Sequence, residues 1–237
     1  MNRNHLGPAL VLGATLALGL VWSGSYLKDA VQLWKQADRV VAVKGLAERE
    51  VKADLALWPL SFSVSADSLA DLYSAIDTDR NKITAFLTQA GFKDEELSFA
   101  APVVQDLWAN QYRDQRPPRR YKADAVLLVR SKQVEQVRKT QPESALLVSR
   151  GVLLTQSYEH KIQYVFTGLN DIKPQMIAEA TANARQAATQ FAEDANARVG
   201  GIRSAQQGYF SVADLDSYTP EIKQVRVVTS VEYLLEE

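Results

Sequence analysis

The chain has no cysteine, and only two of its 237 residues are histidines. The absence of cysteine excludes disulfides, thiol nucleophiles and thiolate metal ligands. His160 is the one histidine outside the first five residues, and a catalytic triad or a metal site needs partners that this chain can hardly supply. We therefore expect a protein that is not an enzyme and that holds no metal or other cofactor.

An excess of charge of either sign is also missing, since 27 basic residues face 28 acidic ones. A nucleic-acid-binding domain would carry a basic excess, so we expect no nucleic-acid partner. Glycine-rich phosphate loops are absent as well, because Gly200-Gly201 follows an expected helix instead of preceding one. Asp77-Thr78-Asp79 and Asp214-Leu215-Asp216 have the spacing of cation loops, but no glycine follows either of them. We expect both segments to lie on the surface.

The chain does contain one long uncharged run, residues 6–27, which as a helix would extend about 33 Å. A bilayer core is about 30 Å thick, so the run is long enough to cross it. A cleaved signal peptide, with its cleavage site at residues 23–25, is the alternative. The length favours a retained signal-anchor, with a cytoplasmic tail at residues 1–5, a transmembrane helix at 6–27 and a juxtamembrane stalk at 28–39.

Small residues recur at every fourth position of this run. Ala9, Gly13 and Ala17 would lie on one face of the helix, where two membrane helices can approach closely. The alternative is that alanine and glycine are simply common in any signal segment. The spacing therefore marks these three residues as candidates for membrane-helix packing.

Basic residues flank the run unevenly. They are Arg3 before it and Lys28, Lys35 and Arg39 after it. Counted alone, they would leave the following domain in the cytoplasm. The count is small, and two aspartates are interspersed among the basic residues that follow the run.

Residues 40–237 have the pattern of one folded domain. Period-two alternation predicts strands over 41–54, 56–65, 97–108, 121–129, 158–166, 202–212 and 224–235. Helical spacing and end signals predict helices over 68–90, 131–148 and 170–199. Because most strands follow one another through hairpins, we expect an α+β fold. It would have a mainly antiparallel sheet packed by two or three helices, preceded by a single N-terminal transmembrane helix.

Several residues carry finer expectations. Pro59 cannot donate to a ladder, so its strand is expected to be an edge at that point, and Gly45 is expected to break or bulge the first strand. His160 would be a core or interface residue on the apolar face of a strand. The longest helix would end at Gly200-Gly201. Its larger packing anchors are expected to be Ile172, Met176, Phe191 and Val199.

A basic segment between two expected strands is the most distinctive functional candidate. It comprises four arginines and three aromatic neighbours: Arg113, Arg116, Arg119, Arg120, Trp108, Tyr112 and Tyr121. Guanidinium groups beside aromatic rings can bind acidic headgroups, polysaccharide or a neighbouring subunit. The alternative is a solvated hairpin tip whose charge Asp106 and Asp114 partly neutralise.

Two stretches of the chain form a characteristic pair. Residues 43–56 have a strand with a glycine, followed by a turn into a second strand. Residues 178–200 form an alanine-rich helix that ends in glycine, before a strand and a final valine-rich strand. Together they resemble the SIMPL-domain family of bacterial envelope proteins, over about residues 40–236. Ala53 stands where that family usually has proline.

This resemblance implies an α+β domain on the outer side of the cytoplasmic membrane, self-assembly into oligomers and a role in envelope or oxidative-stress defence. It outweighs the count of basic residues, so we expect a periplasmic domain held at the inner membrane, with itself as partner and no catalytic site. The alternative hypothesis is a periplasmic ligand-binding or scavenging module with a pocket between sheet and helices. A hydrolase would need a carboxylate with a strongly shifted pKa inside a cleft.

Overall fold

The computed structural model of the protein describes residues 39–109, 117–155 and 160–236, together with residues 13, 15, 17, 19 and 22, which are helical. The rest of the expected signal-anchor, the tail before it and the stalk up to residue 38 lie outside the described residues. Among the residues that the structure does describe, no helix combines the length and the apolar character that crossing a membrane requires.

The chain divides into two compact units. The first, called the α5 unit below, comprises Met1–Glu48, Lys173–Phe210 and Arg226–Glu237. The second, the α2 unit, comprises Arg49–Ile172 and Ser211–Val225. The strands form two antiparallel sheets where one was expected, and the α+β class is confirmed.

The α2 unit is built on a five-stranded sheet of order β3-β5-β2-β6, with β4 also paired to β5. Its strands are β2 (Leu55–Ala66), β3 (Leu97–Phe99), β4 (Val103–Asp106), β5 (Tyr121–Ser131) and β6 (Gln163–Val165). Its helices are α2 (Leu69–Gln89), the 3₁₀ helix η1 (Asp94–Glu96), α3 (Val134–Glu143) and α4 (Ala145–Ser149). The ladder between β2 and β5 is continuous from Ala56 opposite Ser131 to Ala66 opposite Tyr121. These two long antiparallel strands form the centre of the sheet in this unit.

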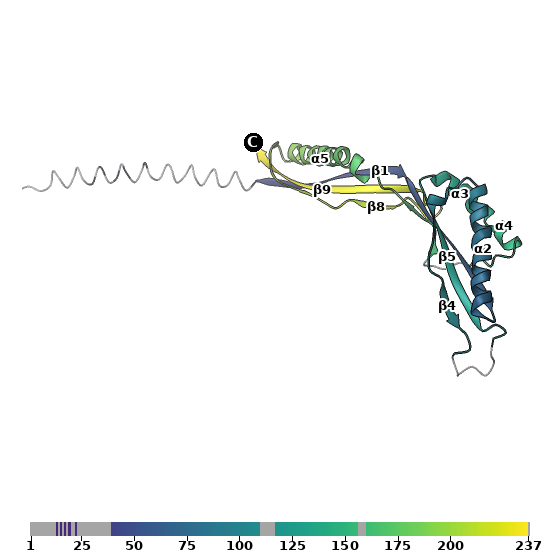
Figure 1. Ribbon diagram of the computed structural model, residues 1–237. Helices are drawn as coiled ribbons and strands as arrows, with labels where there is room; N and C mark the ends of the chain where they lie inside the picture. Colours follow the sequence, from purple (N-terminus) through teal and green to yellow (C-terminus); the bar gives the residue numbers. More distant parts are fainter. Residues whose placement is uncertain are drawn as a thin grey trace, which may run out of the picture. The chain divides into compact units, whose positions relative to one another are not determined.

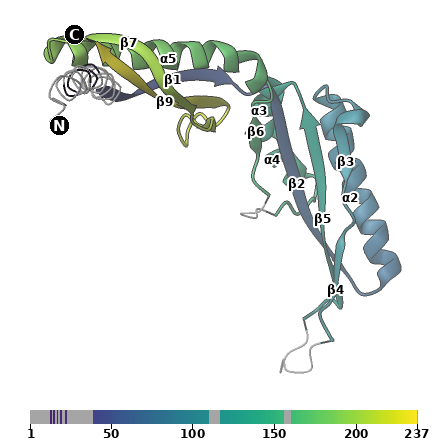
Figure 2. The same ribbon diagram turned by 90° about the vertical axis from the view of Figure 1, so that its left-hand side faces the viewer.

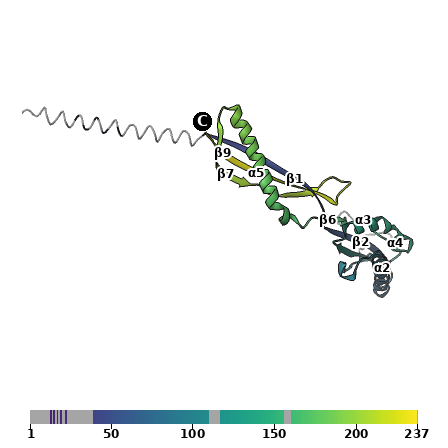
Figure 3. The ribbon, with the colours of Figure 1, turned by 90° about the horizontal axis from the view of Figure 1, so that it is seen from above.

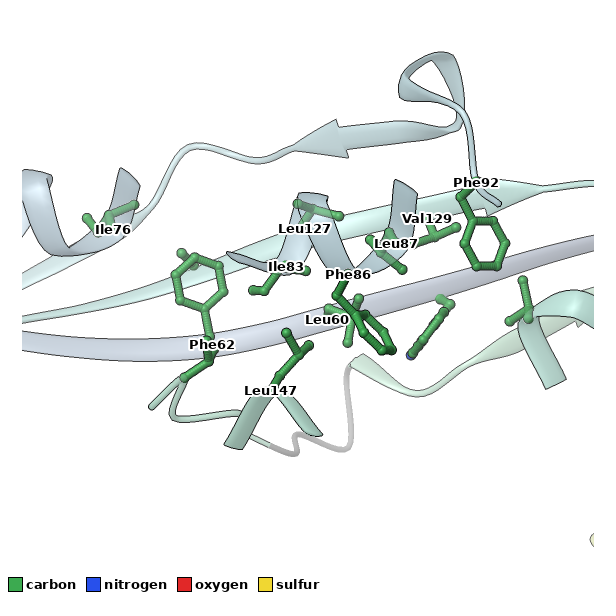
Figure 4. Packing of buried hydrophobic residues seen from close by; sticks show 14 of the residues in the cluster. Leu60, Phe62, Ile76, Ile83, Phe86, Leu87, Phe92, Leu127, Val129 and Leu147 are labelled. Atoms are coloured by element: carbon green, nitrogen blue, oxygen red, sulfur yellow. The ribbon is translucent and has the colours of Figure 1, made fainter. Parts of the chain in front are cut away.

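The core of the α2 unit consists of large side chains. Alternate residues of β2 point to one face of the sheet, where Leu60 and Phe62 are buried. The long helix α2 runs beside β2 and β5 (Figure 2), and Ile83 and Leu87 pack from it against the same face, where Leu147 of α4 joins them (Figure 4). Burial of these aliphatic and aromatic groups is the main source of stability of the unit.

The helix expected over 68–90 is confirmed, together with its end signals. Ser68 is the N-cap, and its Oγ accepts a hydrogen bond of 3.1 Å from the backbone N–H of Asp71. Gly91 follows the helix with φ of +96°, a conformation that glycine adopts without strain. The backbone N–H of Phe92 then donates to the carbonyl of Leu87 at 3.0 Å, which closes the last turn.

The α5 unit has one long helix on one face of its sheet (Figures 1 and 3). Strands β1 (Val40–Lys52), β9 (Ile222–Glu236) and β7 (Arg198–Gln207) lie in the order β1-β9-β7. Strand β8 (Ser211–Asp214), which also pairs with β9, belongs to the α2 unit. Helix α5 (Leu169–Asp194) buries a row of alanines at four-residue spacing: Ala180, Ala184, Ala188 and Ala192. These side chains are so small that the helix backbone comes close to the strands.

Gly45 shows how close that approach is. A Cβ atom placed on Gly45 would overlap the carbonyl oxygen of Ala180 and the backbone nitrogen of Ala184. Strand β1 passes through Gly45 without interruption, so the expected break there is wrong. The glycine is needed because any side chain at this position would collide with the backbone of α5.

The expected end and anchors of the long helix need correction. Helix α5 ends at Asp194, and Asn196 with φ of 52° takes the left-handed position that commonly follows a helix. Gly200-Gly201 instead lies in β7, at a shift of register against β9. Met176 is fully buried as expected, but Phe191 is 62% exposed and anchors nothing in the unit. The row of alanines leaves no room under the helix for an aromatic ring.

Two of the expected strands are longer than the strands observed in those segments. The strand expected over 158–166 is only β6, and His160 lies before it as an exposed residue, so its placement in a core is wrong. Residues 97–108 form two short strands, β3 and β4, rather than one. The helix expected over 131–148 is present as α3 and α4, with Pro142 inside the last turn of α3.

Candidate functional site

The base of the arginine hairpin is held together by Arg120. Its guanidinium Nε and Nη2 donate to Oδ2 of Asp106 at 3.1 and 2.9 Å. The same group lies 4.9 Å from the centre of the Tyr121 ring and 5.8 Å from that of Trp108, within the range of cation–π attraction. Trp108 Nε1 donates to the carbonyl of Pro117 at 3.1 Å, which links the two arms of the hairpin.

This ion pair shifts the pKa values of both of its partners. The hydrogen bond from Arg120 is the largest influence on Asp106 and lowers the pKa of its carboxyl below the ordinary value. The same hydrogen bond raises the pKa of the Arg120 guanidinium. Both groups therefore stay charged at neutral pH, and the Arg120 side chain is positioned as a structural element of the hairpin.

The structure places the other predicted residues of this segment in different surroundings. Arg119 forms an ion pair with Asp67, just beyond the end of β2. Tyr112, Arg113 and Arg116 lie outside the described residues, as does Ala9 of the membrane-helix candidates. Partial neutralisation by Asp106, the alternative expected from the sequence, is observed for Arg120. Sequence reasoning missed Asp67, which is 52 positions before its partner and carries no local signal.

Strand β4, which leads into this hairpin, is covered on neither face. It pairs with β5 alone, and its burial is low throughout. Val103 is 62% exposed, Val104 is also exposed, and Trp108 just beyond the strand is 39% exposed. A short strand with apolar side chains on both faces and a backbone edge is an available contact surface. We call Val103, Val104 and Trp108 the hairpin surface.

The α2 unit also contains a cleft of about 1240 Å³ along β2, on the side away from β5. That side is paired in two separate stretches. Strand β6 pairs with Leu55–Leu57, and farther along Ser63 N donates to Leu153 O at 3.0 Å while Thr155 N donates to Ser61 O at 2.9 Å. Pro59, which has no N–H to donate, lies between the two stretches. Among the described residues β2 therefore has no strand partner on this side at Pro59, as expected for an edge at that point, although it is an inner strand before and after the proline. The cleft opens beside this proline.

Polar groups converge on this cleft. Arg138 of α3 donates from Nη1 to Oε1 of Glu221 at 2.9 Å, and Glu221 is largely buried. Burial is the main cause that raises the pKa of the nearby Tyr164 phenol, and the carboxylate of Glu221 adds to it. His160 and Lys161 also line the cleft. Of these residues only His160 was considered as a functional candidate from the sequence, and it was expected to be a core or interface residue.

No group of three or more histidine, aspartate or glutamate side chains that could hold a metal ion occurs in the described part of the chain. Most ion pairs found there join one acid to one base, and Arg138 pairs with both Glu135 and Glu221. Asp216, one of the two aspartates of an expected surface segment, accepts hydrogen bonds from Tyr218 N and Thr219 N at 2.6 and 2.8 Å. The hydroxyl of Thr219 contributes most to lowering the pKa of Asp216. The hydrogen bonds of Asp216 therefore stabilise the turn that contains Tyr218 and Thr219.

A comparison with models of protein families shows to which family the chain belongs. The model of the family described as SIMPL, a protein of unknown function (DUF541), matches residues 41–233. The chain belongs to the SIMPL family. The match runs from the start of β1 nearly to the end of β9, so both sheets lie within the SIMPL domain, and the resemblance seen in the sequence is confirmed. No curated protein matches the chain. Because the family's function is unknown, its membership assigns no active residue to this SIMPL protein.

Proposed function

We propose that this SIMPL protein is a non-enzymatic component of the cell envelope, anchored in the inner membrane by residues 6–27 and working in the periplasm as a homo-oligomer. Its role would be in envelope or stress defence. The support for the anchor is the uncharged run, whose length matches a bilayer core. The anchor would raise the local concentration of the domain, which favours association through weak contacts.

The observation that carries the proposal is the hairpin surface. Val103 and Trp108 expose apolar area on a strand whose outer backbone edge continues the five-stranded sheet. The Arg120–Asp106 pair stiffens this edge, so little conformational entropy would be lost on contact. A stiff, exposed, partly apolar edge fits association with another protein surface.

Charge complementarity points to a second copy as the partner. The segment between β4 and β5 carries the four arginines, of which Arg119 and Arg120 already pair with Asp67 and Asp106 within the same copy. The same unit presents three consecutive acidic residues in η1, Asp94–Glu96. One copy's basic segment can therefore meet another copy's acidic η1, either twice across a two-fold axis in a closed pair or head to tail in a ring or filament.

A lysine placed in the hairpin surface tests this assembly. Val103→Lys in the full chain, extracted in mild detergent, is expected to lower the mass of the assembly in light scattering. Leu146→Lys, at an apolar site on α4 that is 52% exposed, is the matched control and should leave the mass unchanged. Equal masses for Val103→Lys and the unmodified chain, with both folded by circular dichroism, would overturn the hairpin contact.

Topology requires a separate test. Alkaline phosphatase fused after residue 237 is active only outside the cytoplasm, so the proposal predicts an active fusion that fractionates with the inner membrane. An inactive fusion would place the domain on the cytoplasmic side, as the basic residues that flank the run suggest.

A second candidate function, a periplasmic ligand-binding or scavenging module, is favoured by one specific observation. The cleft beside Pro59 combines apolar walls with convergent polar groups, the combination typical of small-molecule sites. The two functions are compatible, because the cleft and the hairpin surface share no residue.

A further inference from the structure

Strand β1 of the α5 unit has a partner on one side only. It pairs with β9, and no strand of the described chain lies on its other side. The carbonyl of Arg39 accepts a hydrogen bond of 2.8 Å from Leu235 N of β9. Because neighbouring residues of a strand direct their backbone groups to opposite sides, the odd-numbered residues of β1 bond to β9 and the even-numbered ones direct theirs outward. Such an edge can pair with a further strand.

Helix α5 occupies one point of this edge. Asn183 Nδ2 donates to the outward carbonyl of Leu46 at 2.8 Å. In the part of the chain that the structure describes, no hydrogen bond engages the outward backbone groups of residues 40–44. This first part of β1 is therefore an open edge, and Ala42 is its midpoint.

An exposed aromatic side chain lies beside the open edge. Asn183, Ala187 and Phe191 form a row at four-residue spacing along one flank of α5. The first bonds to Leu46 and the second packs against the same cluster as Val41, so the row runs toward the start of β1. Phe191, the next member, is 62% exposed. Its ring supplies apolar area for a contact at this edge.

The sequence of the open edge is complementary to itself. An antiparallel pair of two copies centred on Ala42 places Val41 of each copy opposite Val43 of the other, and β-branched pairs of this kind stabilise sheets. Lys44 then lies opposite Val40, so no like charges face each other. A pair centred two residues later would instead oppose two copies of Lys44.

From these observations we propose that two copies of this protein associate by antiparallel pairing of their β1 strands over residues 40–44, about a two-fold axis at Ala42. The two sheets join into one, and the Phe191 rings of both copies cover the junction. The inference rests on the proposed homo-oligomer and adds an isologous contact in the α5 unit to the hairpin contact of the α2 unit. The proposed anchor favours a second copy as the partner, because it would hold both copies in one membrane.

The absence of cysteine allows a test by disulfide formation in the full chain. Ala42→Cys places the thiols of two copies at the axis, where opposite Cα atoms lie about 5.5 Å apart, a separation that a disulfide can bridge. Lys44→Cys, on the same edge, is the matched control, because its two thiols would lie about 14 Å apart along the strands. Each variant is oxidised in membranes of the expression host, and the linked dimer is measured on non-reducing gels. We expect several-fold faster linking for Ala42→Cys, and equal rates would overturn the proposal.

The role of the aromatic ring is tested in the Ala42→Cys chain. Phe191→Ser removes the ring and should slow disulfide formation several-fold, because the junction loses its apolar cover. Tyr209→Ser, which removes a ring that is 99% exposed elsewhere in the same unit, is the control and should leave the rate unchanged. Equal rates for the two variants would refute the contact assigned to Phe191.

A proline at the axis blocks the pairing without removing a hydrogen bond of the protomer. The N–H of Ala42 points outward, and proline is tolerated at such a position of an edge strand. Ala42→Pro in the full chain, extracted in mild detergent, should show a lower mass in light scattering than the unmodified chain, with an unchanged circular dichroism spectrum. An unchanged mass would refute the β1 contact alone, whereas a protomer mass for the unmodified chain would refute the homo-oligomer itself.

Discussion

The two units of this SIMPL protein reach a packed core by opposite means. In the α2 unit, large side chains such as Phe62 and Leu87 fill the space between sheet and helices. In the α5 unit, Ala184, Ala188 and Gly45 remove side-chain volume so that helix and strand backbones meet. The first core should be sensitive to the loss of volume, and the second to its gain.

Loss of volume in the α2 unit should have the largest effect. Phe62→Ala removes a fully buried ring and is expected to cost about 3–5 kcal/mol of stability in that unit. Amide hydrogen exchange by mass spectrometry should show faster exchange in α2 and β5, with α5 little affected. Equal acceleration in α5 would mean that the two cores do not behave as separate cooperative units.

Gain of volume in the α5 unit should have the second-largest effect on stability. Ala184→Leu is expected to cost about 1–3 kcal/mol or more, because the added atoms meet the backbone of β1. Ala182→Leu, on the exposed side of the same helix, is the matched control and should change the melting temperature little. Similar melting temperatures for the two variants would contradict the close packing that the comparison rests on.

The ends of the two long helices sharpen the comparison. Gly91 and Asn196 both have positive φ, at +96° and 52°. Gly91→Ala should destabilise the α2 unit by about 1–2 kcal/mol, since a Cβ is strained in this conformation. Asn196→Gly should be neutral or slightly stabilising in chemical denaturation. A large loss in Asn196→Gly would show that the asparagine side chain, rather than its backbone conformation, ends α5.

The smallest effect is expected at the hairpin base and depends on pH. The pKa of Asp106 is lowered in the folded state, so its ion pair stabilises the hairpin above the ordinary pKa of an aspartate, about 4. This contribution is lost as the pH falls through the lowered pKa. The indole N–H resonance of Trp108 should shift over that acidic range, and Asp106→Asn should abolish the shift. A pH-independent resonance in the unmodified chain would contradict the assigned pair.

The sequence predicted most elements of the fold because their signals are local. Helix α2 has its cap at Ser68 and its glycine at Gly91, and the alternation along β2 marks its buried face. The end of α5 was misplaced, because Gly200-Gly201 is a stronger signal than Asn196, although only Asn196 adopts the left-handed conformation. Gly45 was expected to break or bulge its strand, and its close approach to α5 was missed because Ala180 and Ala184 lie 135 or more residues away, beyond any local pattern.

The candidate sites were less predictable for the same reason. The arginine-rich hairpin is contiguous in the sequence, so its composition alone identified it. The cleft joins β2, α3, α4, β6 and the loop before β9, which no local pattern of the sequence brings together. Only tertiary structure shows that Arg138 and Glu221, 83 positions apart, pair at this cleft.

Assembly of identical copies is the central claim, and the solution mass of the full chain tests it most directly. The protein would be extracted in mild detergent and measured by multi-angle light scattering on a sizing column, with the detergent mass subtracted. The account predicts one discrete species whose protein mass is a multiple of the protomer. A measured mass equal to one protomer, unchanged when the protein concentration is raised about tenfold, would contradict it.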